Sequence, residues 1–200
     1  MSTEDELHSI SKSVSEAEKN TSGEIIPMVV LSSSTAHQTV MFAFLMIQLI
    51  LVNLSEVLEI DDTYFSLQFG ITVILFLIFK RQLVKKLSFA KKYDQMIWDR
   101  AELEFYRGRM HETAKRTGIL IFISMLERRV IVLADKSISD KHDQKTWDDL
   151  VHTIAQHMSK KKLALGLSEA IAQCGKILSK DFPAESNNPN EYADRLIIKK

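Results

Sequence analysis

Two long apolar runs without a single charged residue constrain this chain more than any other feature. They are VMFAFLMIQLILVNL at residues 40–54 and YFSLQFGITVILFLIF at residues 64–79. Each is slightly shorter than the ~20 residues that cross a bilayer as a helix, and flanking residues bring both close to that length. Because both runs are apolar on every side, they differ from surface helices of a small domain. They predict transmembrane helices at about 37–55 and 62–80; the alternative is a pair of buried core helices.

The charges on either side of these runs predict the orientation of the hairpin. The connector SEVLEIDD carries four acidic residues, whereas KRQLVKKLSFAKK after the second run is strongly basic. Basic flanks stay in the cytoplasm, so we expect the acidic turn outside and both chain ends inside. Residues 81–97 form a basic juxtamembrane segment, which either lies on anionic headgroups or acts only as a stop-transfer flank.

The segments outside the hairpin have the patterns of a soluble α/β domain. Before it we expect a helix at 4–19 and a strand at 24–31, in which Pro27 lies at an edge or an irregularity. After it we expect a helix at 96–110 and an antiparallel strand pair at 118–124 and 130–135, joined by a solvated MLERR turn. A polar loop, KSISDKHDQK, then leads to a helix with a capping box at Thr146 and Asp149. A second helix ends before Pro183, and RLIIKK forms a tail strand.

These elements predict an α/β/α sandwich interrupted by a two-helix transmembrane hairpin. Residues 1–34 supply the first helix and strand, 35–80 the hairpin, 81–97 the basic segment and 98–200 the remainder of the domain. An even number of crossings returns both parts of the domain to one compartment. We therefore expect a multi-pass protein of the inner membrane whose domain faces the cytoplasm.

Composition excludes some functions. The 26 basic residues equal the 26 acidic residues, so the charge balance gives no indication of nucleic-acid binding. The chain has one cysteine, Cys174, which excludes an internal disulfide. It lies on an apolar helix face, so we expect a buried, unreactive thiol.

Three segments carry a resemblance to a known family. SGEIIPMVV, RTGILIFISMLERRVIVLADKSI and the tail DFPAESNNPNEYADRLII, with its NE-x-x-D-R motif, resemble the TPM-domain family over about residues 5–33 and 98–198. The internal hairpin departs from the simplest members and resembles a membrane-anchored bacterial subgroup. The resemblance implies an α/β/α sandwich. It also implies several functions, because some members are acid phosphatases, some bind calcium and some assist assembly or repair of membrane complexes.

The densest candidate site is the loop ADKSISDKHDQKTWDD. Asp135, Asp140 and Asp143 are spaced so that their oxygens can coordinate a hard cation such as Ca²⁺ or Mg²⁺. The alternative is structural, with Asp135 in a turn and later carboxylates favouring a helix N-terminus. The spacing does not match an EF-hand loop, and His142 could join a site in this loop.

We therefore predict a membrane-anchored domain that binds or assists partner proteins at the bilayer, without assigned catalytic residues. The rival is a metal-dependent acid phosphatase that uses Asp135, Asp140 and Asp143 to activate water or as a nucleophile. A third possibility is a transporter accessory whose hairpin contacts a membrane protein. Gln48, Asn53 and Gln68 are predicted to hydrogen-bond between the two membrane helices.

Overall fold

The chain divides into two compact units. A computed structural model describes residues 3–33, 36–57, 59, 61–87, 90–185 and 190–199. The first unit joins Met1–Ser33 to Ile97–Lys200, and the second comprises Ser34–Met96. Two pieces that lie far apart in the sequence therefore form one unit.

A four-stranded sheet forms the centre of the first unit. Its strands, in spatial order, are β3 (Arg129–Ala134), β2 (Gly118–Ser124), β1 (Glu24–Val30) and β4 (Ile197–Lys199). β1 pairs in parallel with both β2 and β4, whereas β2 and β3 are antiparallel. Every residue of β2 is buried, which is why its sequence is a continuous apolar run. The predicted strand pair and the tail strand are confirmed.

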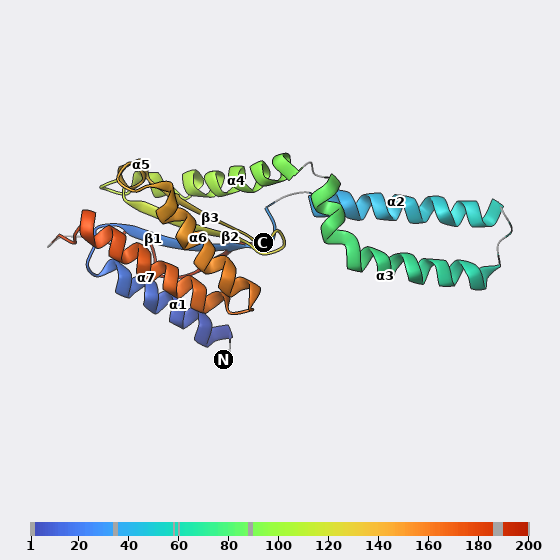
Figure 1. Cartoon of the computed structure of the whole chain (residues 1–200), viewed down its shortest axis with the longest axis horizontal. Helices are drawn as coiled ribbons and strands as arrows, with labels where there is room; N and C mark the ends of the chain where they lie inside the picture. Colours follow the sequence, from blue (N-terminus) through green and yellow to red (C-terminus); the bar gives the residue numbers. More distant parts are fainter. Residues whose placement is uncertain are drawn as a thin grey trace. The chain divides into compact units, whose positions relative to one another are not determined.

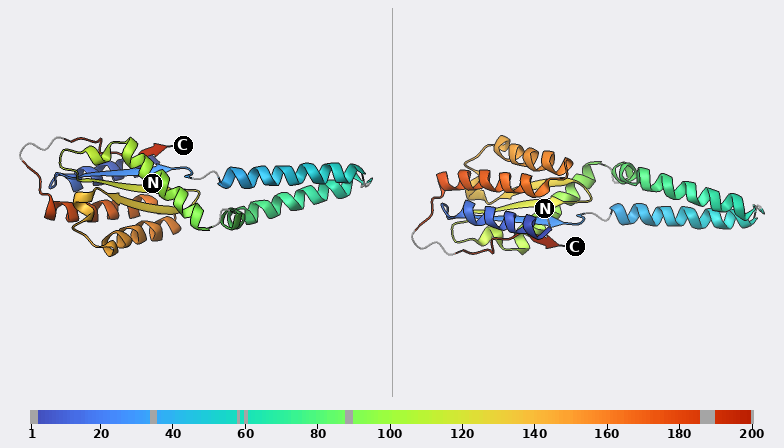
Figure 2. Two further views of the ribbon diagram at one scale, coloured as in Figure 1. Left: turned by 90° about the horizontal axis from the view of Figure 1, so that it is seen from above. Right: turned by 90° about the horizontal axis from the view of Figure 1, so that it is seen from below.

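Helices cover both faces of this sheet. α1 (Thr3–Glu18), α6 (Gln144–Ser159) and α7 (Leu163–Asp181) lie on one face, and α4 (Ala90–Arg107) lies on the other (Figure 1 and Figure 2). The first face forms a continuous core in which Ile119, Ile121 and Ile123 of β2 pack with side chains of the three helices. α4 has its own buried stripe, Ile97, Ala101 and Phe105, spaced four residues apart. The mixed α/β architecture is confirmed.

The local expectations have mixed outcomes. β1 is a central strand, but β4 pairs only with its residues from Met28 onward, so Pro27 lies where β1 has no partner from β4 and is locally at an edge, as expected. The expected polar loop after β3 contains a short helix, α5 (Lys136–Ser139), because Ile138 is fully buried in the core. The cap of α6 is Asp143 and not Thr146, since the Asp143 carboxylate accepts from the Thr146 backbone N–H at 3.1 Å.

The second unit is a pair of helices, α2 (Ala36–Val57) and α3 (Asp62–Leu87). Gln48 Nε2 of α2 donates to Thr72 Oγ1 of α3 at 2.8 Å, so the predicted interhelical role of Gln48 is confirmed. Asn53 instead bonds the Leu49 carbonyl of its own helix, which differs from the prediction. Phe44 and Phe76 stack with ring centroids 4.2 Å apart.

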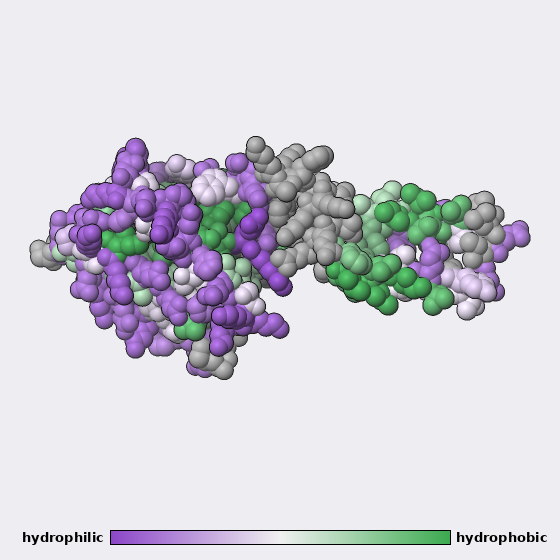
Figure 3. Space-filling view, viewed as in Figure 1, coloured by the Kyte–Doolittle hydropathy of each residue, from purple (hydrophilic) through white to green (hydrophobic). Residues whose placement is uncertain are grey.

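Much of the visible surface of this helix pair is apolar, with polar residues toward the connector between the helices (Figure 3). Large side chains such as Leu45, Ile50 and Ile78 are 53%, 60% and 61% exposed. By length and composition, one helix among the described residues can cross a membrane, over Gln38–Ser55; the apolar part of α3, Ser66–Phe79, is shorter. The two predicted helices are confirmed as helices, and their insertion in a bilayer stays a prediction.

Candidate functional site

The first unit contains an acidic cleft in which the pKa values of two glutamate side chains are raised. The cleft has a volume of about 310 Å³ and lies between α1, the start of β1 and the C-terminal tail. Its lining combines four carboxyl side chains, Glu18, Glu24, Glu185 and Asp194, with Ser15, Lys19, Ala184 and Asn190. Perturbed carboxyls in a cleft are characteristic of functional sites, although structural networks produce them too.

Glu18 is the most perturbed carboxyl of the cleft. It ends α1, and its Oε1 accepts from the Ile25 backbone N–H at 2.6 Å. Burial raises its pKa to about 8, and the negative charges of Glu24 and Asp194 act in the same direction, against the hydrogen bond from Ile25. Glu18 therefore holds a proton at neutral pH, where an ordinary glutamate is ionised.

Glu24 connects the cleft to the tail. It begins β1, is only 3% exposed, and accepts from the backbone N–H groups of Glu191 at 3.2 Å and Tyr192 at 3.3 Å. Burial raises its pKa, opposed by these two hydrogen bonds and assisted by the charges of Glu191 and Asp194. Both carboxyls thus accept hydrogen bonds from backbone N–H groups, and the pKa of each is raised.

The arrangement gives the cleft two chemical capacities. A protonated Glu18 can donate a proton near neutral pH, which is the property a general acid needs. A cation that bound here would have to displace protons, because metal ligands must be deprotonated. The tail segment also depends on the cleft, since Tyr192 Oη donates to the Gly108 carbonyl at 2.7 Å while its backbone N–H bonds Glu24.

The predicted cation loop is arranged differently. Asp135 caps α5 by accepting from the Lys136 N–H at 2.6 Å, and Asp140 pairs with Lys136 Nζ at 2.8 Å. Asp143 caps α6, and the hydrogen bonds from the side chain and backbone of Thr146 lower its pKa. Each of the three carboxylates thus has its own nearby partner. Within the part of the chain that the structure describes, no group of three or more histidine, cysteine, aspartate or glutamate side chains is placed to hold a metal ion.

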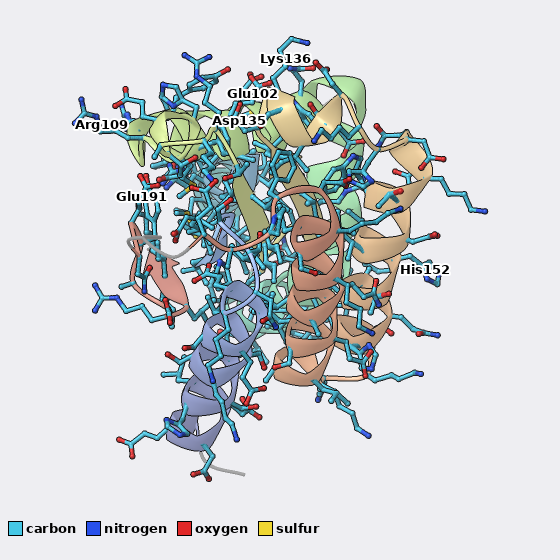
Figure 4. The ribbon with its side chains drawn as sticks, turned by 90° about the vertical axis from the view of Figure 1, so that its left-hand side faces the viewer. Glu102, Arg109, Asp135, Lys136, His152 and Glu191 are labelled. Carbon is cyan, nitrogen blue, oxygen red and sulfur yellow. The ribbon has the colours of Figure 1, made fainter. Side chains whose placement is uncertain are left out.

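Two further predicted residues also have definite places. His142 turns toward α7, where its Nε2 lies 2.8 Å from Asp181 Oδ2. Cys174 is fully buried on α7, and burial raises its pKa to about 12, so the expected unreactive thiol is confirmed. Figure 4 shows Asp135 and Lys136 near α5 and Glu191 on the C-terminal tail, well apart from them. The cation loop and the acidic cleft are therefore separate places on the domain.

Sequence reasoning did not identify the acidic cleft. Its signal is present in the segments that carry the family resemblance, because Glu24 belongs to SGEIIPMVV and Asp194 belongs to the NE-x-x-D-R motif. Glu18 has no such signal and reads as the polar end of an amphipathic helix. The three carboxylates meet only because β4 returns alongside β1.

Comparisons with known proteins agree with this fold. Residues 82–177 match the family model described as the TPM domain. The NMR structure of the BA42 protein from the psychrophilic bacterium Bizionia argentinensis is similar to this chain with a TM-score of 0.63 at 20% identity, over 98% of this chain and 94% of that one. At that identity the likeness concerns the fold alone. A search of curated proteins gave no match.

Proposed function

Since this chain is a member of the TPM-domain family, we propose that it is a membrane-anchored domain that binds or assists partner proteins at the inner membrane. The bilayer is its first partner and a membrane protein its second. The domain faces the cytoplasm, and the helix pair α2–α3 is its anchor.

The observation that carries this proposal is the position of the helix pair in the chain. β1 precedes the pair, yet it lies between β2 and β4, which both follow it. Because the segments before and after the helix pair form one domain, both must lie in the same compartment. A hairpin that crosses the membrane twice satisfies that requirement. The exposed apolar surface of α2 and α3 supports burial in lipid or against another membrane helix.

The charges support the orientation. The connector between the helices, residues 55–62, is acidic, and the stretch after the second apolar run is basic. Cytoplasmic flanks carry the excess of lysine and arginine, so the domain and both chain ends lie on the cytoplasmic side.

The test has two stages in cells that express the full chain. Alkaline carbonate should leave the protein in the membrane pellet, and external protease should spare the domain in right-side-out spheroplasts. In crosslinking, the partner should be captured by the native chain and lost when both apolar runs are replaced by leucine helices of equal length. Extraction by carbonate would contradict the anchor, and undiminished capture by the leucine variant would contradict a role of the hairpin in partner binding.

A phosphatase-like hydrolase is the second candidate, and the protonated Glu18 beside Glu24 is the observation that favours it. Such an enzyme should lose phosphate-ester turnover in Glu18→Gln if the cleft is its site. It should lose turnover in Asp140→Ala/Asp143→Ala if the cation loop, loaded with Ca²⁺ or Mg²⁺, is its site. An adaptor should tolerate both changes without loss of partner capture.

A further inference from the structure

Three exposed apolar side chains lie together at the end of the sheet where β1 leads toward α2. We call Leu31, Met125 and Leu126 the apolar tip; they are 55%, 39% and 43% exposed. The Leu126 N–H donates to the Leu31 carbonyl at 3.0 Å, and the Met125 N–H donates to the Val30 carbonyl at 3.0 Å. Scattered exposed leucines are ordinary on protein surfaces, but these two hydrogen bonds hold Met125 and Leu126 beside the strand end that carries Leu31, so the three form a patch.

A buried glutamate holds the tip in place. Glu127 is 3% exposed, so the expectation of a solvated turn is wrong for this residue. Its carboxylate accepts from Ser32 Oγ at 2.7 Å, from the Ser33 N–H at 3.2 Å and from Ser124 Oγ. These bonds connect the β2–β3 turn to the last residues before the hairpin. The tip is therefore a fixed feature of the domain.

Positive charge lies beside the apolar tip. Arg128 and Arg129 follow directly in the turn and are both exposed. Arg128 has a φ of 52°, a conformation that costs an L-residue more than a glycine. The turn thus presents a guanidinium group at a position where glycine would be less strained.

A short segment of chain joins this end of the domain to its first apolar helix. Ser33 belongs to the domain, and α2 begins at Ala36. Three residue steps limit the distance between these Cα atoms to about 11 Å. If α2 enters a bilayer, the apolar tip lies within reach of its headgroups.

We propose that the apolar tip and its two arginines form an interfacial membrane contact, in which the three apolar side chains enter the headgroup boundary and Arg128 and Arg129 bind anionic lipid. The contact fixes the orientation of the domain on the bilayer. Amphipathic surfaces of apolar and basic residues bind this region of membranes. The inference rests on the proposed membrane anchor and adds a second contact to it.

The experiment uses the full chain in nanodiscs of phosphatidylcholine and phosphatidylglycerol. A bimane fluorophore is attached at Leu126→Cys, and at Lys136→Cys as the matched control. Lys136 is 82% exposed and follows β3 at the opposite end of the strand pair. The native Cys174 is fully buried and should not react. Lipids that carry a nitroxide near the headgroup then quench any fluorophore at the interface.

Co-elution with the discs tests whether the helix pair anchors the protein, and quenching tests whether the apolar tip contacts lipid. We expect most of the fluorescence at position 126 to be lost and that at position 136 to be unchanged. Arg128→Gly should weaken quenching at 126 in discs with phosphatidylglycerol and leave it unchanged in pure phosphatidylcholine. If the protein co-elutes with the discs but quenching is equally weak at both positions, the anchor stands and the membrane contact of the apolar tip is overturned. That result is expected if the tip binds a protein instead. Protein that stays outside the discs would overturn the anchor and the tip together.

Discussion

The raised pKa of Glu18 gives a prediction about stability at the scale of one residue. The folded state holds the Glu18 proton up to about pH 8, whereas a glutamate in the unfolded chain releases it near the ordinary value of 4.5. Between these two values the folded state binds more protons, so the free energy of unfolding falls as pH rises. We expect Glu18→Gln to remove most of that fall, because glutamine is neutral and its Oε1 still accepts from Ile25.

The measurement is the melting temperature of the detergent-solubilised full chain at several pH values from about 5 to 8. The native chain should lose melting temperature toward the alkaline end, and Glu18→Gln should exceed it there. In Glu18→Gln, part of the fall in melting temperature with rising pH should remain, since burial also raises the pKa of Glu24. Identical slopes in the two proteins would show that Glu18 is ionised throughout the range.

Glu127 gives a second prediction for a single side chain. Glu127→Ala removes the acceptor of a backbone N–H and two hydroxyls, and buried donors left without a partner cost about 1–3 kcal/mol. The matched control is Glu185→Ala, whose 65% exposed side chain pairs with Lys115 at the surface and should cost about 0–1 kcal/mol. Urea unfolding at constant pH measures both. A cost for Glu127→Ala no larger than that of the control would contradict the proposed fixing of the turn.

At the scale of elements, the start of α6 separates a structural role of Asp143 from a metal-binding role. Removing the cap in Asp143→Ala should destabilise the domain by about 1 kcal/mol, whereas Asp143→Asn keeps an accepting oxygen and should cost much less. If Asp143 also binds a cation, Ca²⁺ or Mg²⁺ should raise the melting temperature of the native chain. That rise should be lost in Asp143→Asn. A cap alone predicts no ion-dependent shift in any of the three proteins.

The elements that the sequence predicts well are those with a local signal. GILIFIS and VIVLAD are continuous apolar runs with a short turn between them, and Pro183 marks the end of α7. The α6 cap is misplaced because Asp143 and Thr146 are three residues apart and either can cap a helix. Only the observed hydrogen bond decides between them. α5 has four residues, too few to produce a period.

The acidic cleft could not be predicted for a different reason. Glu18 and Glu24 are near each other in sequence, but Asp194 comes from the far end of the chain. Their meeting depends on β4 pairing beside β1, which is a non-local contact. The burial that raises the pKa of Glu18 also arises only after the tail has folded over α1. No pattern within α1 alone contains that information.

At the scale of the whole molecule, the domain should be separable from its helix pair. All strand pairings and the main core lie within the first unit. We expect a variant in which residues 34–96 are replaced by a flexible linker of roughly 15 residues, with a mean reach on the order of 20 Å, to fold and stay in solution. Its thermal unfolding should be cooperative, and carbonate should not be needed to release it from membranes.

Two results would contradict this expectation. A variant that melts without a cooperative transition would show that the helix pair contributes to the core of the domain. A variant that still pellets with membranes would show that the first unit alone carries the membrane affinity. As a control, a linker of the same length replaces residues 186–189 in the full chain. This control measures the effect of inserting flexible chain by itself.

The interruption between β1 and β2 also sets an order of events during synthesis. Glu24 of β1 pairs with Gly118 of β2, so the first strand must wait for 94 further residues before its partner exists. At the usual rate of translation this delay is on the order of 10 s. Both apolar helices leave the ribosome within that interval, before the sheet can close. If these helices form the proposed anchor, it is available for insertion first, and the domain then completes its fold on a chain already tethered to the membrane.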